Sequence, residues 1–111
     1  MNIAFDVDDC LIVPSVATGL PDDTPNYETI GIYFWLKQQG NTMYIWSGSG
    51  IDWASRWNEK LGLGAQVIVK EKRGDIDIAF DDCDVDLATV NVKVKRIQNA
   101  ISRKRWNTEK R

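Results

Sequence analysis

The chain has 111 residues, of which 43% are hydrophobic and 27% are charged, and its net charge at pH 7 is −2. This length suits one domain with a packed core, and no apolar run approaches the roughly 20 residues of a membrane-spanning helix. The chain contains no histidine, which excludes histidine-based catalytic triads, histidine zinc sites and histidine general bases.

Apolar strand-like runs alternate with helix-like stretches, which is the pattern of a parallel α/β sheet. The first strand is expected over residues 2–7, and residues 12–24 are rich in turn formers and predict a loop or a short hairpin. A helix is expected to begin at Thr24 as the N-cap, with Pro25 at its first helical position, and to end near Gly40. Its apolar stripe is formed by Tyr27, Ile30, Phe34 and Trp35.

Four further strands are expected, over residues 42–46, 65–69, 76–80 and 90–94. A second helix is expected over residues 52–61, ending at Gly62, and its Trp53 and Trp57 are interpreted as residues that pack it onto the sheet. The strict alternation of residues 90–94 favours an edge strand. The fold class is therefore α/β: a three-layer, Rossmann-like domain around a parallel sheet of about five strands.

Charge is distributed unevenly along the chain. Residues 96–111 contain six basic residues and one acidic residue, a net charge of +5, which leaves −7 for residues 1–95. We therefore divide the chain into a domain of residues 1–95 and a basic tail of residues 96–111, expected to be helical because Ile97 and Ile101 are four residues apart. A solvated terminus is the favoured interpretation of this tail, and contact with nucleic acid is the alternative.

Cys10 and Cys83 are the two cysteines, and they do not form a disulfide framework. They are interpreted as small packing residues, because two thiols without histidine do not make a zinc site. No signal-peptide pattern is visible. A reducing, cytoplasmic setting without a membrane is expected.

Polar residues follow four of the predicted strands, at the ends where open α/β sheets bind ligands. Asp6 and Asp8 follow the first strand, on one face because strand side chains alternate. Ser47 and Gly48 follow the strand over 42–46. The remaining candidates are a lysine, either Lys70 or Lys72, and the pair Asp81 and Asp82. Two close carboxylates repel each other, so such a site needs a cation, a shared proton or a phosphoryl group.

These motifs resemble, in their order along the chain, those of the haloacid dehalogenase (HAD) superfamily of phosphohydrolases. The first motif of that family is an apolar strand followed by Asp-x-Asp-x-Thr-Leu, which here is Asp6-Val7-Asp8-Asp9-Cys10-Leu11. The others are a strand ending in Ser or Thr, a lysine, and a strand ending in aspartates, which correspond to Ser47, Lys70 or Lys72, and Asp81-Asp82. The resemblance covers about residues 1–95.

The resemblance implies a magnesium-dependent phosphatase. Asp6 would attack phosphorus and form an aspartyl-phosphate, Asp8 would act as general acid and then general base, and the lysine, Lys70 by preference, would neutralise charge. Ser47 and the amide of Gly48 would bind phosphoryl oxygens. Asp6, Asp81 and the carbonyl of Asp8 would hold Mg²⁺, with Asp82 assisting through water.

The chain departs from the family pattern in two places. Cys10 stands where the family usually has threonine, and a thiol is a weaker hydrogen-bond partner than a hydroxyl. Neither gap between motifs can hold a cap domain. A capless, open site suits a bulky phosphorylated substrate or closure by a neighbouring subunit of a homo-oligomer, and residues 12–24 are a candidate lid.

Three other functions compete with the phosphatase. A receiver-like phosphoacceptor domain has a similar length and acidic pocket, but its motifs follow different strands. A non-catalytic interaction module is suggested by Cys10 alone, and a nucleic-acid end phosphatase by the basic tail alone. The substrate is not identified by the sequence.

Overall fold

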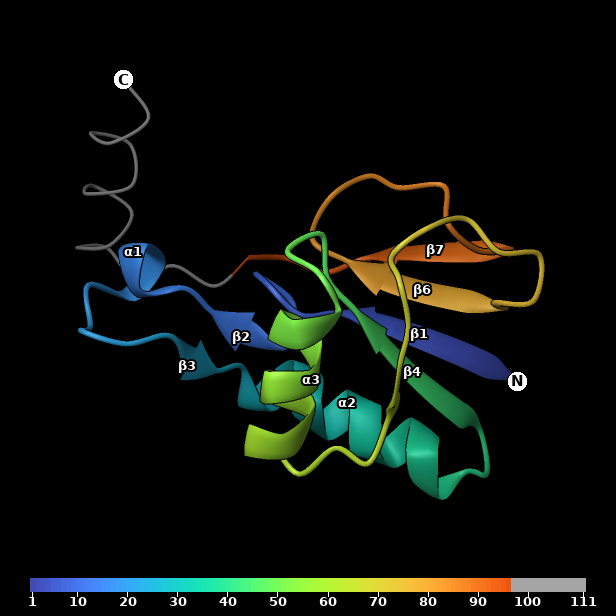
Figure 1. Ribbon diagram of the computed structural model, residues 1–111, viewed down its shortest axis with the longest axis horizontal. Helices are drawn as coiled ribbons and strands as arrows, with labels where there is room; N and C mark the ends of the chain where they lie inside the picture. Colours follow the sequence, from blue (N-terminus) through green and yellow to red (C-terminus); the bar gives the residue numbers. More distant parts are fainter. Residues whose placement is uncertain (97–111) are drawn as a thin grey trace.

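The computed structural model describes residues 1–96, which are built around a five-stranded, all-parallel sheet (Figure 1). The strands lie in the order β5-β4-β1-β6-β7. Their bounds are β1 Asn2–Asp6, β4 Thr42–Trp46, β5 Gln66–Val67, β6 Ile78–Asp81 and β7 Val90–Lys93. Each predicted strand is present, although β5 is shorter than the expected 65–69.

The chain changes direction across the sheet once. From β1 it steps outward to β4 and β5, and it then crosses to the other side of β1 to add β6 and β7. Counted in chain order, the five strands of the sheet lie 3-2-1-4-5, which is the Rossmann-like arrangement, and ligands in such sheets bind where the order reverses. That point lies at the carboxyl ends of β1 and β6, which are Asp6 and Asp81.

Helix α2 spans Tyr27–Gln38 and begins later than the sequence predicted. Its N-cap is Asn26, whose side chain accepts a hydrogen bond from the Thr29 amide, whereas Thr24 and Pro25 form strand β3. The expected apolar stripe was partly wrong: Ile30 is buried as expected, but Tyr27 and Trp35 are exposed, and Tyr33, which was not assigned to the stripe, is buried. Helix α3 spans Ile51–Lys60, close to the predicted range.

The two faces of the sheet are covered differently. Figure 1 shows the two longer helices on the lower side of the sheet and the loops 68–77 and 82–89 on the upper side. Alternate strand residues such as Ile3, Phe5 and Ile45 join one core cluster with residues of α2 and α3. Ala4 and Ala79 join a second cluster, to which the loops contribute Ile68, Ile76, Leu87 and Ala88.

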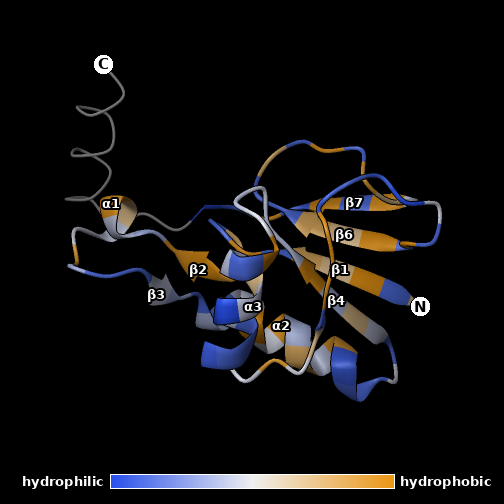
Figure 2. Cartoon of the chain, in the orientation of Figure 1, coloured by the Kyte–Doolittle hydropathy of each residue, from blue (hydrophilic) through white to orange (hydrophobic). Residues whose placement is uncertain are grey.

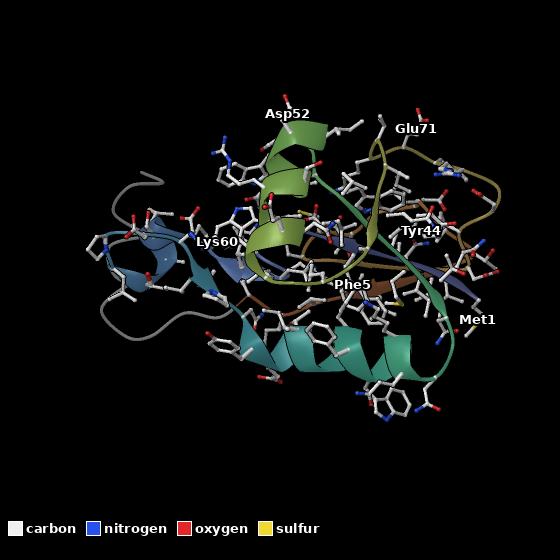
Figure 3. All side chains as sticks on the ribbon, turned by 60° about the horizontal axis from the view of Figure 1, so that its bottom comes forward. Met1, Phe5, Tyr44, Asp52, Lys60 and Glu71 are labelled. Carbon is white, nitrogen blue, oxygen red and sulfur yellow. The ribbon has the colours of Figure 1, made fainter. Side chains whose placement is uncertain are left out.

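The three-layer prediction was therefore wrong for the described residues, because loops replace one helical layer. Figure 3 shows Phe5 between the sheet and α2, and Glu71 with its loop on the opposite side. Figure 2 shows that apolar residues dominate the central strands and that the outer surface of α3 is hydrophilic. The amphipathic helix thus contributes its apolar side to the core.

Residues 12–25 form the small hairpin that was one of the two predicted alternatives. Strands β2 (Ile12–Val13) and β3 (Thr24–Pro25) pair antiparallel, and the short helix α1 (Ser15–Thr18) lies between them. The hairpin projects beyond the carboxyl end of β1 (Figure 1). No cap domain is inserted at this point.

Strand β7 is an edge strand, as expected, and all four of its residues are exposed. The predicted tail helix lies outside the described residues. Within residues 1–96, none of the helices has the length and apolar character needed to cross a bilayer.

Candidate functional site

Two buried carboxylates meet one lysine at the carboxyl end of the sheet. Lys70 Nζ lies 3.1 Å from Asp6 Oδ1 and 2.7 Å from Asp81 Oδ2. The aspartates end the neighbouring strands β1 and β6, while Lys70 reaches them from the loop after β5. Asp6 and Asp81 follow Ala4 and Ala79 on the loop-covered face, so small side chains leave space for the approach of Lys70.

Burial governs the charge of this group. The pKa of Asp6 is raised from 3.8 to about 7, first by desolvation and then by the charge of Asp81, while Lys70 opposes both effects. Burial lowers the pKa of Lys70, but its hydrogen bonds with Asp81 and Asp6 outweigh that effect and raise it above 10.5. The lysine is therefore a fixed positive charge between the two carboxylates.

Asp8 belongs to a different cluster from Asp6. Strand β1 ends at Asp6, and residues 7–9 turn away, with Asp9 at a positive φ of 59°. Asp8 Oδ2 accepts a hydrogen bond from Ser47 Oγ at 3.2 Å, and Asp8 Oδ1 accepts one from Trp53 Nε1 at 3.1 Å. The expectation that Asp6 and Asp8 continue one strand face was wrong, because the turn begins between them.

Ser47 is buried at the end of β4, which is paired with β1, and this pairing brings it to Asp8. The Ser47 hydroxyl donates to Asp8 and accepts a hydrogen bond from the Ser49 amide at 3.0 Å. Gly48 lies in the exposed loop before α3, and a Cβ added there would meet open space. Ser47 and Gly48 thus lie at the same end of the sheet as Asp6, Asp8 and Asp81.

The structure separates the two candidate lysines. Lys72 pairs with Asp86 at 2.9 Å, and both side chains are largely exposed. Lys70 contacts the buried carboxylates instead. Of the two lysines that the sequence offered for the site, Lys70 is the one that lies beside Asp6 and Asp81.

Asp82 is held by a residue that the sequence analysis did not assign to the site. Arg96 donates to Asp82 Oδ2 through Nε at 2.9 Å and lies 2.8 Å away through Nη2. Its guanidinium is also 4.0 Å from Asp9 Oδ2. Asp82 therefore faces a guanidinium rather than Lys70, which removes it from the pair formed by Asp6 and Asp81.

The two cysteines have different environments. Cys10 is buried in the core, its thiol donates to the Phe80 carbonyl at 3.7 Å, and burial raises its pKa well above 9.0. Cys83 is exposed, so its interpretation as a packing residue was wrong. Its Sγ and the carboxylate oxygens of Asp81 and Asp82 lie within 4.8 Å of one another. The guanidinium of Arg96 already neutralises part of the negative charge of this group. The group alone is therefore not assigned as a metal site.

Asp6 and Asp81 fit a hard divalent cation by their chemistry. Both are buried carboxylates that point at one positive charge, and Asp81 Oδ2 has no hydrogen-bond donor other than Lys70 among the described residues. Oxygen ligands of this kind suit Mg²⁺, which keeps several waters and takes one or two carboxylates from the protein.

Trp53 and Arg96 are the two contacts of the site that sequence reasoning missed. Trp53 was interpreted as packing, and it does contact Trp57 edge-to-face at 6.1 Å, but its indole N–H is directed at Asp8. The position of a tryptophan in the first turn of a helix after Ser-Gly-Ser-Gly was the available signal.

Comparisons with models of protein families, with curated proteins and with solved structures found no match to this chain.

Proposed function

We propose that this protein is a magnesium-dependent phosphatase that hydrolyses phosphomonoesters through an aspartyl-phosphate on Asp6. The observation that carries the proposal is the convergence of Asp6 and Asp81 on Lys70, at the point where the strand order reverses. Buried like charges are costly, and groups whose pKa is shifted by burial and a charged partner are concentrated at functional sites. The motif order along the chain supports the same conclusion.

In the first step, a carboxylate oxygen of Asp6 attacks phosphorus in line. The bond between phosphorus and the ester oxygen breaks, and its electron pair goes to the leaving oxygen, which takes a proton from Asp8. In the second step, water attacks the phosphorus of the aspartyl-phosphate and gives a proton to Asp8. Inorganic phosphate leaves, and the Asp6 carboxylate is restored.

Other residues would stabilise the charge that moves during both steps. Lys70 would attract the phosphoryl oxygens, since its ammonium already lies against Asp6. Ser47 and the amide of Gly48 would bind phosphoryl oxygens beside it, which requires the Ser47 hydroxyl to turn from Asp8 toward the substrate. Asp6, Asp81 and the carbonyl of Asp8 would hold Mg²⁺, which supplies positive charge against the phosphate and keeps Asp6 ionised.

The strand order favours this proposal over a receiver-like phosphoacceptor. Receiver domains have the flavodoxin-like order 2-1-3-4-5, whereas the present sheet has the order 3-2-1-4-5 when its strands are numbered along the chain. The position of Ser47 after the second strand of the sheet and of Asp81 after the fourth agrees with that difference.

The test is hydrolysis of 4-nitrophenyl phosphate with Mg²⁺. We expect sustained turnover that a chelator abolishes and that Asp6→Asn lowers by at least about 1,000-fold, because the nucleophile is lost. The matched control is Asp84→Asn, which removes an exposed carboxylate that pairs with Lys93 at 3.3 Å and with no other basic residue among residues 1–96, and which should leave turnover unchanged.

Two outcomes contradict the proposal. Stable phosphorylation of Asp6 without release of phosphate indicates a phosphoacceptor domain. Absence of reaction across nucleotides, sugar phosphates and phosphorylated nucleic-acid ends indicates an interaction module without turnover.

A further inference from the structure

Trp53 donates a hydrogen bond to Asp8, the proposed general acid, through the only polar atom of its side chain. Its Nε1 lies 3.1 Å from Asp8 Oδ1, on the opposite oxygen of the carboxyl group from the one that Ser47 contacts. The two donors come from different elements, since Trp53 lies on α3 and Ser47 follows β4. Asp8 is thus held from two sides, although it sits in a turn rather than on a strand.

The path of the chain into α3 directs the indole at Asp8. Gly50 is the N-cap, with φ at 103°, a value that side-chain-bearing residues rarely adopt. Trp53 follows in the first turn and is supported by the Trp57 ring at 6.1 Å and by Arg56, whose guanidinium carbon lies 5.8 Å from the ring centre. The indole therefore has contacts that hold it in place independently of Asp8.

An indole N–H can only donate a hydrogen bond. The N–H of Trp53 therefore stabilises the form of Asp8 in which Oδ1 carries no proton. Ser47 Oγ donates to Oδ2, but a hydroxyl can also accept a hydrogen bond, so Oδ2 can carry the proton once this hydroxyl turns. A carboxyl group that was free to rotate would divide its proton between two oxygens, only one of which lies beside Ser47, a proposed phosphate-binding residue.

We propose that Trp53 is a positioning residue that fixes Asp8 so that its Oδ2 delivers the proton to the leaving group. This inference rests on the proposed phosphatase function. Helix α3 then has a part in the reaction beyond packing. We expect Trp53 to affect proton transfer rather than substrate affinity.

The chain offers a matched control in Trp57. Its Nε1 is buried and has no hydrogen-bond partner among the described residues, so Trp57→Phe removes an indole N–H that makes no such contact. Trp53→Phe removes the N–H that reaches Asp8 and keeps an aromatic ring in the same place. Both variants lose the same atoms, and they differ in what those atoms contact.

The first measurement compares two substrates with Mg²⁺ present. An alkyl phosphate has a poor leaving group that needs the proton, whereas 4-nitrophenyl phosphate has a good one that needs it little. For Trp53→Phe we expect kcat/KM, which reports the first step and not the shared hydrolysis of the aspartyl-phosphate, to fall about 10- to 100-fold on the alkyl phosphate, as for other residues that orient a reacting group. The kcat/KM of Trp53→Phe on 4-nitrophenyl phosphate, and of Trp57→Phe on both esters, should be close to that of the native protein.

The second measurement reads the contact itself through the indole N–H signals in a proton–nitrogen NMR spectrum, assigned with the two phenylalanine variants. In Asp8→Ala the Trp53 signal should shift and exchange faster with solvent, and the Trp57 signal should not. An unmoved Trp53 signal, or an equal loss of kcat/KM on both esters in Trp53→Phe, overturns this inference alone. Absence of turnover by the native protein on both esters overturns the proposed function, and this inference with it.

Discussion

The two faces of the sheet are built from alternate residues of the same strands, but they have opposite properties. On the helix-covered face, Phe5 stacks on Phe80 with ring centres 4.3 Å apart and meets Tyr33 edge-on at 5.4 Å. On the loop-covered face, the residues next to these are Ala4 and Ala79, followed by the strand ends that carry carboxylates. On the first face, β1 and β6 contribute stacked aromatic rings. On the second face they contribute alanines beside the buried Trp46 of β4, and they end in carboxylates.

Stability and the candidate chemistry therefore depend on different side chains of β1 and β6. Changes on the helix-covered face should lower the free energy of unfolding without altering cation binding. Changes on the loop-covered face should alter ionisation and cation binding, with smaller effects on folding. Three measurements test whether the two faces are independent.

The largest effect on stability is expected for Phe5→Ala. Phe5 is fully buried, and truncation of a buried phenylalanine costs about 3–5 kcal/mol through lost burial and the cavity that remains. Unfolding by denaturant in the presence of a chelator measures the loss. The additional stability conferred by Mg²⁺ should be retained, and its disappearance in Phe5→Ala would show that the two faces are coupled.

The next effect is a dependence of stability on pH. The folded pKa of Asp6, about 7, lies above its ordinary value of 3.8, so between these values the folded protein keeps a proton that the unfolded chain has released. The free energy of unfolding of the metal-free protein should therefore fall as the pH rises from about 4 to about 7, by up to about 4 kcal/mol.

Denaturant titrations at several pH values, with chelator present, measure this slope. Asp6→Asn, which does not titrate, is the reference, and the difference between the two proteins isolates Asp6 from the other groups. Saturating Mg²⁺ should flatten the slope, because it favours the ionised carboxylate. Parallel curves for the native protein and Asp6→Asn would contradict the burial argument.

The smallest of the three effects is expected for Lys70→Met. This change removes the cation between Asp6 and Asp81, and the loss of stability at pH 7 should be about 2 kcal/mol, less than for a fully buried pair because Asp6 can take up a proton. Lys72→Met is the matched control, with an expected loss below about 0.5 kcal/mol, as for other exposed ion pairs. Equal losses in the two variants would remove Lys70 from the site.

Local pattern was enough to predict the sheet, and it failed where tertiary contacts compete with it. Each strand of the sheet was visible as an apolar run, and Asp6, Ser47 and Asp81 were predicted at strand ends, where the structure has them. The start of α2 was misplaced because Thr24 and Pro25 pair with β2 across a hairpin, a contact that the local signals for a helix start do not contain. The stripe on α2 was misjudged because Trp35 is exposed although it is apolar.

The linear pattern of residues fixes the approximate positions of the five strands and the carboxylates near the ends of the first and fourth of them, because apolar runs and their polar ends are local features. The contact of Lys70 rather than Lys72 with Asp6 and Asp81, that of Arg96 with Asp82 and that of Trp53 with Asp8 appear only in the folded chain. These partners are set by the strand order and by the loops that cross one face. The direction and burial of a side chain depend on neighbours that the linear pattern does not contain.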